Sequence, residues 1–197
     1  MEVMKELGTD SVDLLFADLP YAQTSCKWDV LIDMEKFWKE ANRVCKDDAP
    51  MFFTCSVKFG NTLINSNPKK FRYDLVWVKS QPVGFLNARK MPMKKHEMVY
   101  VFYNKIPKIY TENISLHHKH KFKDKEDHIG ENIYSNKPVF LYKGRGNGSA
   151  YDPPLPNSIL EVKSEKGKHA TQKPVALMEW VLKYYSREND VVLDPTM

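Results

Sequence analysis

Residues 12–21 read Val12-Asp13-Leu14-Leu15-Phe16-Ala17-Asp18-Leu19-Pro20-Tyr21, an apolar run followed by an acid, a proline and an aromatic ring. The nearly continuous apolar run predicts a buried strand of a parallel sheet over residues 12–17. In the turn that follows, a carboxylate can accept a proton or hydrogen bond, and a ring offers a flat face. Residues 18–21 therefore suggest a socket for a planar heterocycle with an exocyclic amine, although acid-x-Pro-Tyr is also an ordinary strand-to-loop turn.

Composition bounds the class of protein. The chain has 197 residues, of which 42% are hydrophobic, which is enough for one domain with a core and an inserted lobe. It contains no apolar run of bilayer-spanning length and no secretory-signal pattern. Its three cysteines lack paired spacing, which disfavours disulfides and thiolate zinc sites, and four histidines between residues 117 and 128 have no cysteine nearby, so no metal is expected. These features predict a cytoplasmic protein, and the net charge of +5 permits a polyanionic partner without requiring one.

Strands and helices are expected to alternate along the chain, which predicts an α/β sheet with helices on both faces. Ligands of such sheets bind beyond the carboxyl ends of strands, where Asp18 and Asp194 stand. Residues 104–168 lose all periodicity and are expected to form a lobe or an extended loop. The predicted strands cover residues 12–17, 51–55, 73–78, 98–103 and 191–193, and the predicted helices cover residues 34–46 (capped by Asp33), 57–66 and 174–187.

Two further segments support a specific resemblance. His169-Ala170-Thr171-Gln172-Lys173-Pro174 precedes a helix, and Asp194-Pro195-Thr196-Met197 ends the final strand. Together with residues 18–21, they resemble the site-specific DNA amino-methyltransferases that use S-adenosylmethionine, in the permuted beta order. Cys26-Lys27-Trp28-Asp29, Ser66-Asn67-Pro68 and Asn87-Ala88-Arg89-Lys90 are similar to segments of adenine methyltransferases common in phages and prophages. The resemblance covers nearly the whole chain and is loosest over residues 104–168.

The resemblance implies a Rossmann-like methyltransferase sheet, mixed but mostly parallel, with an inserted target-recognition region. Residues 1–103 would form the catalytic part, residues 104–168 the target-recognition region and residues 169–197 the start of the cofactor-binding part. In the family this last part continues into a glycine-rich turn, whereas this sequence stops at Met197. The expectation is therefore a fragment that binds S-adenosylmethionine poorly.

The resemblance also implies roles for residues 18–21. The Asp18 carboxylate and the backbone carbonyl of Leu19 would grip the two hydrogens of the amine, and Asp18 could take the proton that is lost. Pro20 would fix the turn, and Tyr21 would stack on a base flipped out of the duplex. The family often has a second proline where Leu19 stands and a glycine where Ala22 stands. Aspartate at the first position favours adenine, because relatives that act on cytosine commonly start with serine.

Binding residues are assigned by the same resemblance. Asp194, Pro195, Lys173 and Pro174 would contact the cofactor, although Lys173-Pro174 could equally be a solvated lysine before a proline-initiated helix. A second group could track the phosphates of double-stranded DNA or form a solvated loop. This group consists of Lys119, Lys121, Lys123, Lys143 and Arg145.

The sequence thus predicts a methyltransferase that acts on the exocyclic amine of adenine in duplex DNA, within a restriction-modification or phage setting and with a possible restriction endonuclease partner. The alternatives are the cytosine amine, an RNA or protein amide substrate, and a catalytically incomplete DNA-binding fragment. An unrelated α/β nucleotide-binding protein is disfavoured because no phosphate-cradling glycine motif follows a strand.

Overall fold

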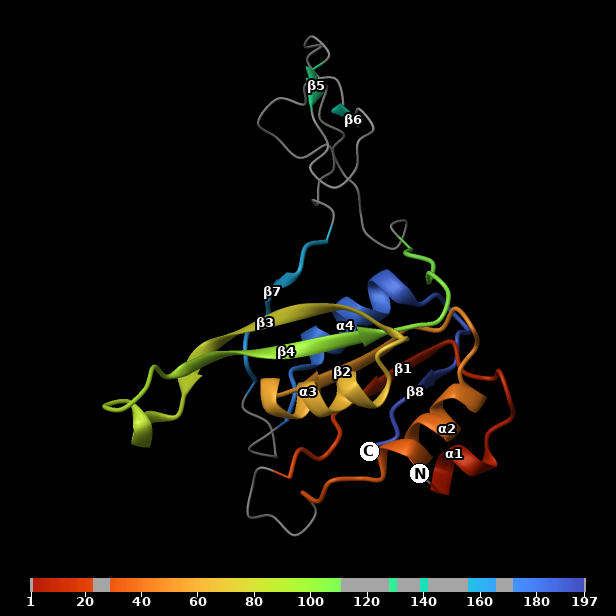
Figure 1. The fold of residues 1–197 in the computed structure, drawn as a ribbon, viewed down its shortest axis with the longest axis horizontal. Coiled ribbons are helices and arrows are strands. Elements are labelled where there is room, and N and C mark those ends of the chain that lie inside the picture. Colours follow the sequence, from red (N-terminus) through yellow and green to blue (C-terminus); the bar gives the residue numbers. More distant parts are fainter. Residues whose placement is uncertain are drawn as a thin grey trace. The chain divides into compact units, whose positions relative to one another are not determined.

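A computed structural model describes residues 2–22, 29–110, 156–165 and 172–196, and the backbone of two short strands at 128–130 and 139–141 (Figure 1). The chain divides into two compact units. The first comprises residues 1–111 and 158–197, and the second comprises residues 112–157. Within the second unit, β5 (His128–Gly130) pairs antiparallel with β6 (Val139–Leu141).

The first unit is built on a six-stranded mixed sheet. In the order in which they lie, its strands are β7 (Ile159–Glu161), β3 (Phe71–Val83), β4 (Lys94–Phe102), β2 (Met51–Cys55), β1 (Leu14–Ala17) and β8 (Val192–Leu193). β1 is parallel to both β2 and β8, and β3 is parallel to β7, whereas β4 is antiparallel to both of its neighbours. The expected mixed α/β sheet is confirmed.

Helices cover both faces of this sheet (Figure 1). Phe52 and Phe53 are adjacent in β2 and therefore point to opposite faces. The Phe53 ring packs against Trp38 of α2 (Met34–Val44), in a core that α3 (Val57–Ser66) and α1 (Glu2–Glu6) complete. The Phe52 ring contacts Tyr185 of α4 (Val175–Tyr185), with 4.9 Å between centroids. Every residue of β1 and β2 is consequently buried, as their apolar sequences require.

Local signals explain where the helices begin. The side chain of Asp33 accepts a hydrogen bond from the Lys36 amide at 3.1 Å, and Ser56 caps α3 in the same way. The predicted helices over residues 34–46, 57–66 and 174–187 are confirmed to within two residues at either end. No helix in the described ranges is long and apolar enough to cross a membrane.

Two features of the sheet were not predicted. β3 and β4 extend well past the expected strands 73–78 and 98–103, because their outer halves are exposed and carry no apolar periodicity. β7 lies inside the region 104–168 that was expected to be irregular, and it pairs with β3 through Leu160 opposite Trp77. Three residues are too short a strand to stand out by pattern.

Candidate active site

The turn at residues 18–21 leaves the carboxyl end of β1 and lines a cavity of about 410 Å³. All four residues face this cavity, together with Lys173 before α4 and side chains from the β3–β4 hairpin. The Leu19 side chain is also part of the hydrophobic core, which anchors the turn. The turn that was predicted to form a socket therefore borders a cavity at the carboxyl end of β1.

The Asp18 carboxylate is held by three side chains. Its Oδ1 accepts a hydrogen bond from the hydroxyl of Thr54 at 2.6 Å, and its Oδ2 lies 2.8 Å from the Lys173 ammonium. The Tyr21 hydroxyl lies 2.6 Å from both Asp18 Oδ1 and the Thr54 carbonyl oxygen, and it can donate to only one of them at a time. An ionised carboxylate has about four acceptor positions. Among the described residues, the contacts of Asp18 leave Oδ2 able to accept one more donor.

Tyr21 is fixed as a hydroxyl donor. Burial and the neighbouring Asp18 charge raise the pKa of its phenol far above the ordinary value of 10, so the hydroxyl keeps its proton at any working pH. Phe59 stacks on the ring, with centroids 5.2 Å apart and planes at 26°. Phe59 thus covers one face of the ring, and the Lys173 ammonium lies 5.9 Å from the ring centroid, so a base that stacks on Tyr21 would lie beside this ammonium.

Four charged side chains of alternating sign line the cavity next to one another. Lys173 lies 3.6 Å from Glu97 Oε2 as well as 2.8 Å from Asp18, and Glu97 Oε1 pairs with Lys79. Asp18, Lys173, Glu97 and Lys79 thus form a row of two carboxylates and two ammonium groups, contributed by four different segments. Such a row fixes the direction of each member, because moving one leaves a half-buried charge without its partner.

Sequence reasoning missed Thr54, Lys79 and Glu97. Thr54 reads as an ordinary strand residue, and only the parallel register of β1 and β2 brings it to Asp18. Lys79 and Glu97 come from neighbouring antiparallel strands, in which Trp77 lies opposite Glu97. A lysine and a glutamate in two successive strands are a signal for a cross-strand pair, but the register that joins them was not evident.

The predicted cofactor residues lie on either side of Asp18. Because β8 pairs with β1, Asp194 reaches the same edge of the sheet, where it accepts hydrogen bonds from both the amide and the hydroxyl of Thr196. The Thr196 hydroxyl in turn accepts from the Asp18 amide at 3.4 Å, so Pro195 lies between two residues that border the turn. Pro174 is buried at the start of α4, directly after Lys173, whose ammonium contacts Asp18 and Glu97. Cofactor binding by these four residues stays a prediction.

Ala22 adopts a conformation that usually belongs to glycine. Its φ is +52°, in the left-handed region, and its amide donates to Asp29 Oδ1 at 2.7 Å. A side chain in that region costs about 1 kcal/mol or more. A glycine, which the resemblance leads one to expect here, would adopt this conformation without that cost, and the buried Asp29 carboxylate holds the strained turn in place.

The expected phosphate contacts fall outside the described residues. Lys119, Lys121, Lys123, Lys143 and Arg145 all belong to this group. Within the ranges that the structure does describe, no group of three or more potential metal ligands is found.

The comparisons with known proteins agree with this architecture. The profile of the DNA methylase family, the N6 and N4 methyltransferases, matches residues 12–197, and the chain therefore belongs to this family. A curated relative is the type II methyltransferase M.HinfI of Haemophilus influenzae, 26% identical over 225 residues. That alignment takes in 99% of this chain but only 56% of the relative, so the chain spans just over half the length of that protein.

Solved structures share the fold. The PvuII DNA methyltransferase, described as cytosine-N4-specific, superposes with a TM-score of 0.61 at 14% identity, covering 98% of this chain and 70% of that one. The complex of M1.HpyAVI with SAM gives a TM-score of 0.54 at 21% identity, covering 100% and 78%. At these identities the likeness establishes the fold, and the substrate base has to be argued from the site.

Proposed function

We propose that the chain transfers a methyl group from S-adenosylmethionine to the exocyclic amine of adenine in duplex DNA. The observation that carries this proposal is the Asp18 carboxylate, which Thr54 and Lys173 hold at the edge of the cavity with one acceptor position left on Oδ2. An aromatic amine is a poor nucleophile because its lone pair is delocalised into the ring. Acceptors that grip its hydrogens favour a pyramidal nitrogen whose lone pair can attack.

Each residue of the turn has a distinct task in this proposal. Asp18 Oδ2 accepts one amine hydrogen and can receive the proton that is lost, and the Leu19 carbonyl accepts the other hydrogen. Pro20 restricts the backbone that aims this carbonyl. Tyr21 stacks on the flipped base, and this contact returns roughly 1–3 kcal/mol of the few kcal/mol that flipping costs.

The residues present fit the cofactor. S-adenosylmethionine supplies an electrophilic methyl group when bound, and Asp194, Pro195, Lys173 and Pro174 would hold it. A cavity of about 410 Å³ is within the usual size of a small-molecule site. Of the four predicted cofactor residues, Lys173 lines this cavity and the other three lie outside its lining. Asp29 and Glu165 line it too, and their carboxylates suit a ligand that carries an ammonium group and ribose hydroxyls.

Adenine is preferred over cytosine because the turn begins with aspartate. The family contains both N6 and N4 enzymes, so the cytosine amine is the second candidate. Residues 104–168 would supply target recognition, with the lysines and arginine named above on the phosphates. A restriction endonuclease that cuts the same sequence is the expected companion, in line with the type II relative.

Methyl transfer from tritium-labelled cofactor tests this function. The parent chain is incubated with duplex DNA, RNA and a protein mixture, and the modified nucleosides are identified by mass spectrometry. We expect N6-methyldeoxyadenosine from DNA. N4-methyldeoxycytidine would select the second candidate, and labelled RNA or protein alone would refute DNA as the substrate.

Asp18→Ala supplies the test of mechanism. Loss of the acceptor should lower the rate of transfer by about 10²-fold or more, the scale of general base catalysis, while cofactor affinity stays within threefold of the parent. Asp74→Ala removes an exposed carboxylate from β3 and serves as the matched control. Turnover of Asp18→Ala within tenfold of the parent would contradict the role of this residue.

A further inference from the structure

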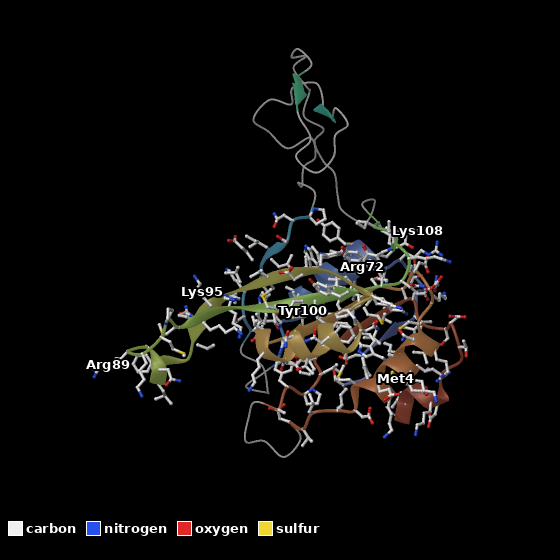
Figure 2. The ribbon with its side chains drawn as sticks, viewed as in Figure 1. Met4, Arg72, Arg89, Lys95, Tyr100 and Lys108 are labelled. Atoms are coloured by element: carbon white, nitrogen blue, oxygen red, sulfur yellow. The ribbon has the colours of Figure 1, made fainter. Side chains whose placement is uncertain are left out.

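The β3–β4 hairpin continues beyond the sheet and ends in an exposed tip, residues 83–93 (Figure 1). The inner part of β3 is buried at Leu75 and Trp77, whereas its outer part turns to solvent. Figure 2 shows Arg89 at the far end of the hairpin and Lys95 on the returning strand. The hairpin tip therefore offers its side chains to something outside this unit.

The tip presents large apolar side chains to water. Leu86 is 96% exposed and Phe85 is 80% exposed, and Met91 and Met93 are also exposed beside them. A cluster of this kind is costly in water and marks a binding surface more often than a chance arrangement. Its position at the end of a hairpin suits insertion into a partner.

The backbone holds these side chains outward. Gly84 has a φ of +93°, and residues 85–87 form a short 3-10 turn. The amides of Asn87 and Ala88 donate to the carbonyls of Gly84 and Phe85 at 3.0 Å. An ordered turn loses little conformational entropy on binding, so the two apolar side chains are preorganised for contact.

The charge around the tip is entirely positive. Arg89, Lys90, Lys94 and Lys95 lie in the segment from Gln81 to His96, which contains no aspartate or glutamate. Within the part of the chain that the structure describes, none of these four forms a salt bridge. Unpaired cations grouped around an apolar tip complement a polyanion with an apolar interior, which is the chemistry of a nucleic acid duplex.

The tip is continuous with the cavity that contains Asp18. Gln81 and Val83 line this cavity, and Phe85 follows Val83 by two residues. Two residues span at most about 7 Å of extended chain, which corresponds to roughly two base steps of 3.4 Å. Phe85 and Leu86 therefore continue the strand that forms one wall of this cavity, within three residues of its last lining residue.

We propose that the hairpin tip inserts Phe85 and Leu86 into the DNA duplex beside the target base and fills the space that this base leaves on flipping. Arg89, Lys90, Lys94 and Lys95 then contact the neighbouring phosphates. The inference rests on the proposed function, which it deepens by naming the element that stabilises the opened duplex.

The double variant Phe85→Ala/Leu86→Ala tests the insertion. The probe is a 30-base-pair duplex that carries the sequence methylated by the parent, with 2-aminopurine at the target position. We expect the fluorescence rise on binding to disappear and the affinity to fall at least tenfold. A second duplex has an abasic site opposite the target, so the target base is already unpaired. On this duplex, the affinity of the double variant should fall less than threefold.

Two controls show what a failure would mean. Ile106→Ala removes a residue that is 83% exposed outside the hairpin, and it should behave as the parent does. The conservative Leu86→Met should keep most of the fluorescence rise. An unchanged rise in the double variant, or an equal loss of affinity on both duplexes, would overturn the insertion. A change of oligomeric state in the double variant would also overturn it, because the tip would then bind protein.

The cations are tested without knowledge of the target sequence. Changing all four to glutamine should lower the slope of log affinity against log salt on an arbitrary 30-base-pair duplex by about four. A reduced slope without methyl transfer would support the hairpin as a DNA contact and refute the proposed reaction. An unchanged slope would refute the hairpin contact whether or not the parent methylates DNA.

Discussion

Thr54 is completely buried, yet its hydroxyl points at the carboxylate that the proposed chemistry depends on. Together with Lys173 it determines the direction of Asp18, so the geometry of the acceptor depends on residues outside the turn. The effect of the supporting residues on the rate of methyl transfer can be measured, because they can be substituted while Asp18 is kept.

Thr54→Val removes the hydroxyl and keeps the shape of the side chain. Asp18 Oδ1 then loses its 2.6 Å hydrogen bond, and we expect the rate of methyl transfer to fall about tenfold, since a hydrogen bond to a charged group contributes about 1.5 kcal/mol or more. Thr54→Ser, which retains the hydroxyl, is the control and should stay within threefold of the parent. Steady-state kinetics at saturating cofactor provide the measurement, and equal rates for the valine and serine variants would contradict the role.

Lys173→Met should lower turnover strongly, because one ammonium group contacts two carboxylates. It leaves both Asp18 and Glu97 without the ammonium group that lies between them, and we expect turnover to fall at least tenfold. Adding Asp18→Asn to this variant removes the carboxylate charge that has lost its ammonium partner, whereas Glu97 stays paired with Lys79, and it should restore part of the stability. A double-mutant cycle of unfolding free energies gives the coupling, and strict additivity would show that the two residues act independently.

At the scale of the elements, α3 packs on β4 through a glycine. A Cβ placed on Gly60 would lie 1.9 Å from the Tyr100 ring, so the helix can approach the strand only because the side chain is missing. Phe59, the neighbour of Gly60, stacks on Tyr21, which links this close packing to the position of the active-site ring.

Gly60→Ala should therefore destabilise the protein in spite of the better helix propensity of alanine. Overpacking costs about 1–3 kcal/mol, against a gain of about 1 kcal/mol from propensity. We expect a net loss of about 1 kcal/mol in the free energy of unfolding by urea denaturation. Asn61→Ala, on the exposed side of the same turn, is the control and should be neutral or stabilising.

The elements that sequence reasoning located have strong local signals. β1 and β2 are continuous apolar runs, and α2 combines the Asp33 cap with an apolar face, so their buried cores were evident. The residues that hold Asp18 had no such local signal. Thr54, Glu97 and Lys173 are far apart in the sequence, and only the strand register and the position of α4 bring them together. The extent of the hairpin was missed for a related reason, since its exposed tip contradicts the apolar pattern that usually marks a strand.

At the scale of the whole molecule, Asp13 joins three distant segments at the start of the sheet. Its carboxylate accepts from the Lys46 ammonium at 2.5 Å and from the Val191 amide at 3.0 Å. Burial raises the pKa of this carboxyl, but the hydrogen bonds from Lys46 and Val191 outweigh that effect, so its pKa lies below the ordinary value of an aspartate. Asp13 therefore stabilises the folded state as a carboxylate.

Asp13→Asn should lower the free energy of unfolding by about 1 kcal/mol at pH 7, a value reduced by partial exposure. Because the folded pKa is depressed, this contribution is complete above the unfolded pKa of about 3.9 and is lost as the pH falls through the folded value. Urea titrations from pH 7 to pH 3 should show the difference between parent and variant narrowing only below about pH 4. A constant difference across this range would exclude ionisation as the cause.

β1 cannot pair with β8 until the end of this sequence has been synthesised. Asp13 and Val191 are separated by 178 positions, and a ribosome that adds roughly 5–20 residues per second needs about 9 to 36 s to pass from one to the other. During that interval β1 can pair with β2 but has an open edge on its other side. An unpaired apolar edge attracts other nascent chains. Expression at reduced temperature or with holdase chaperones should therefore raise the yield of native protein more than faster translation would.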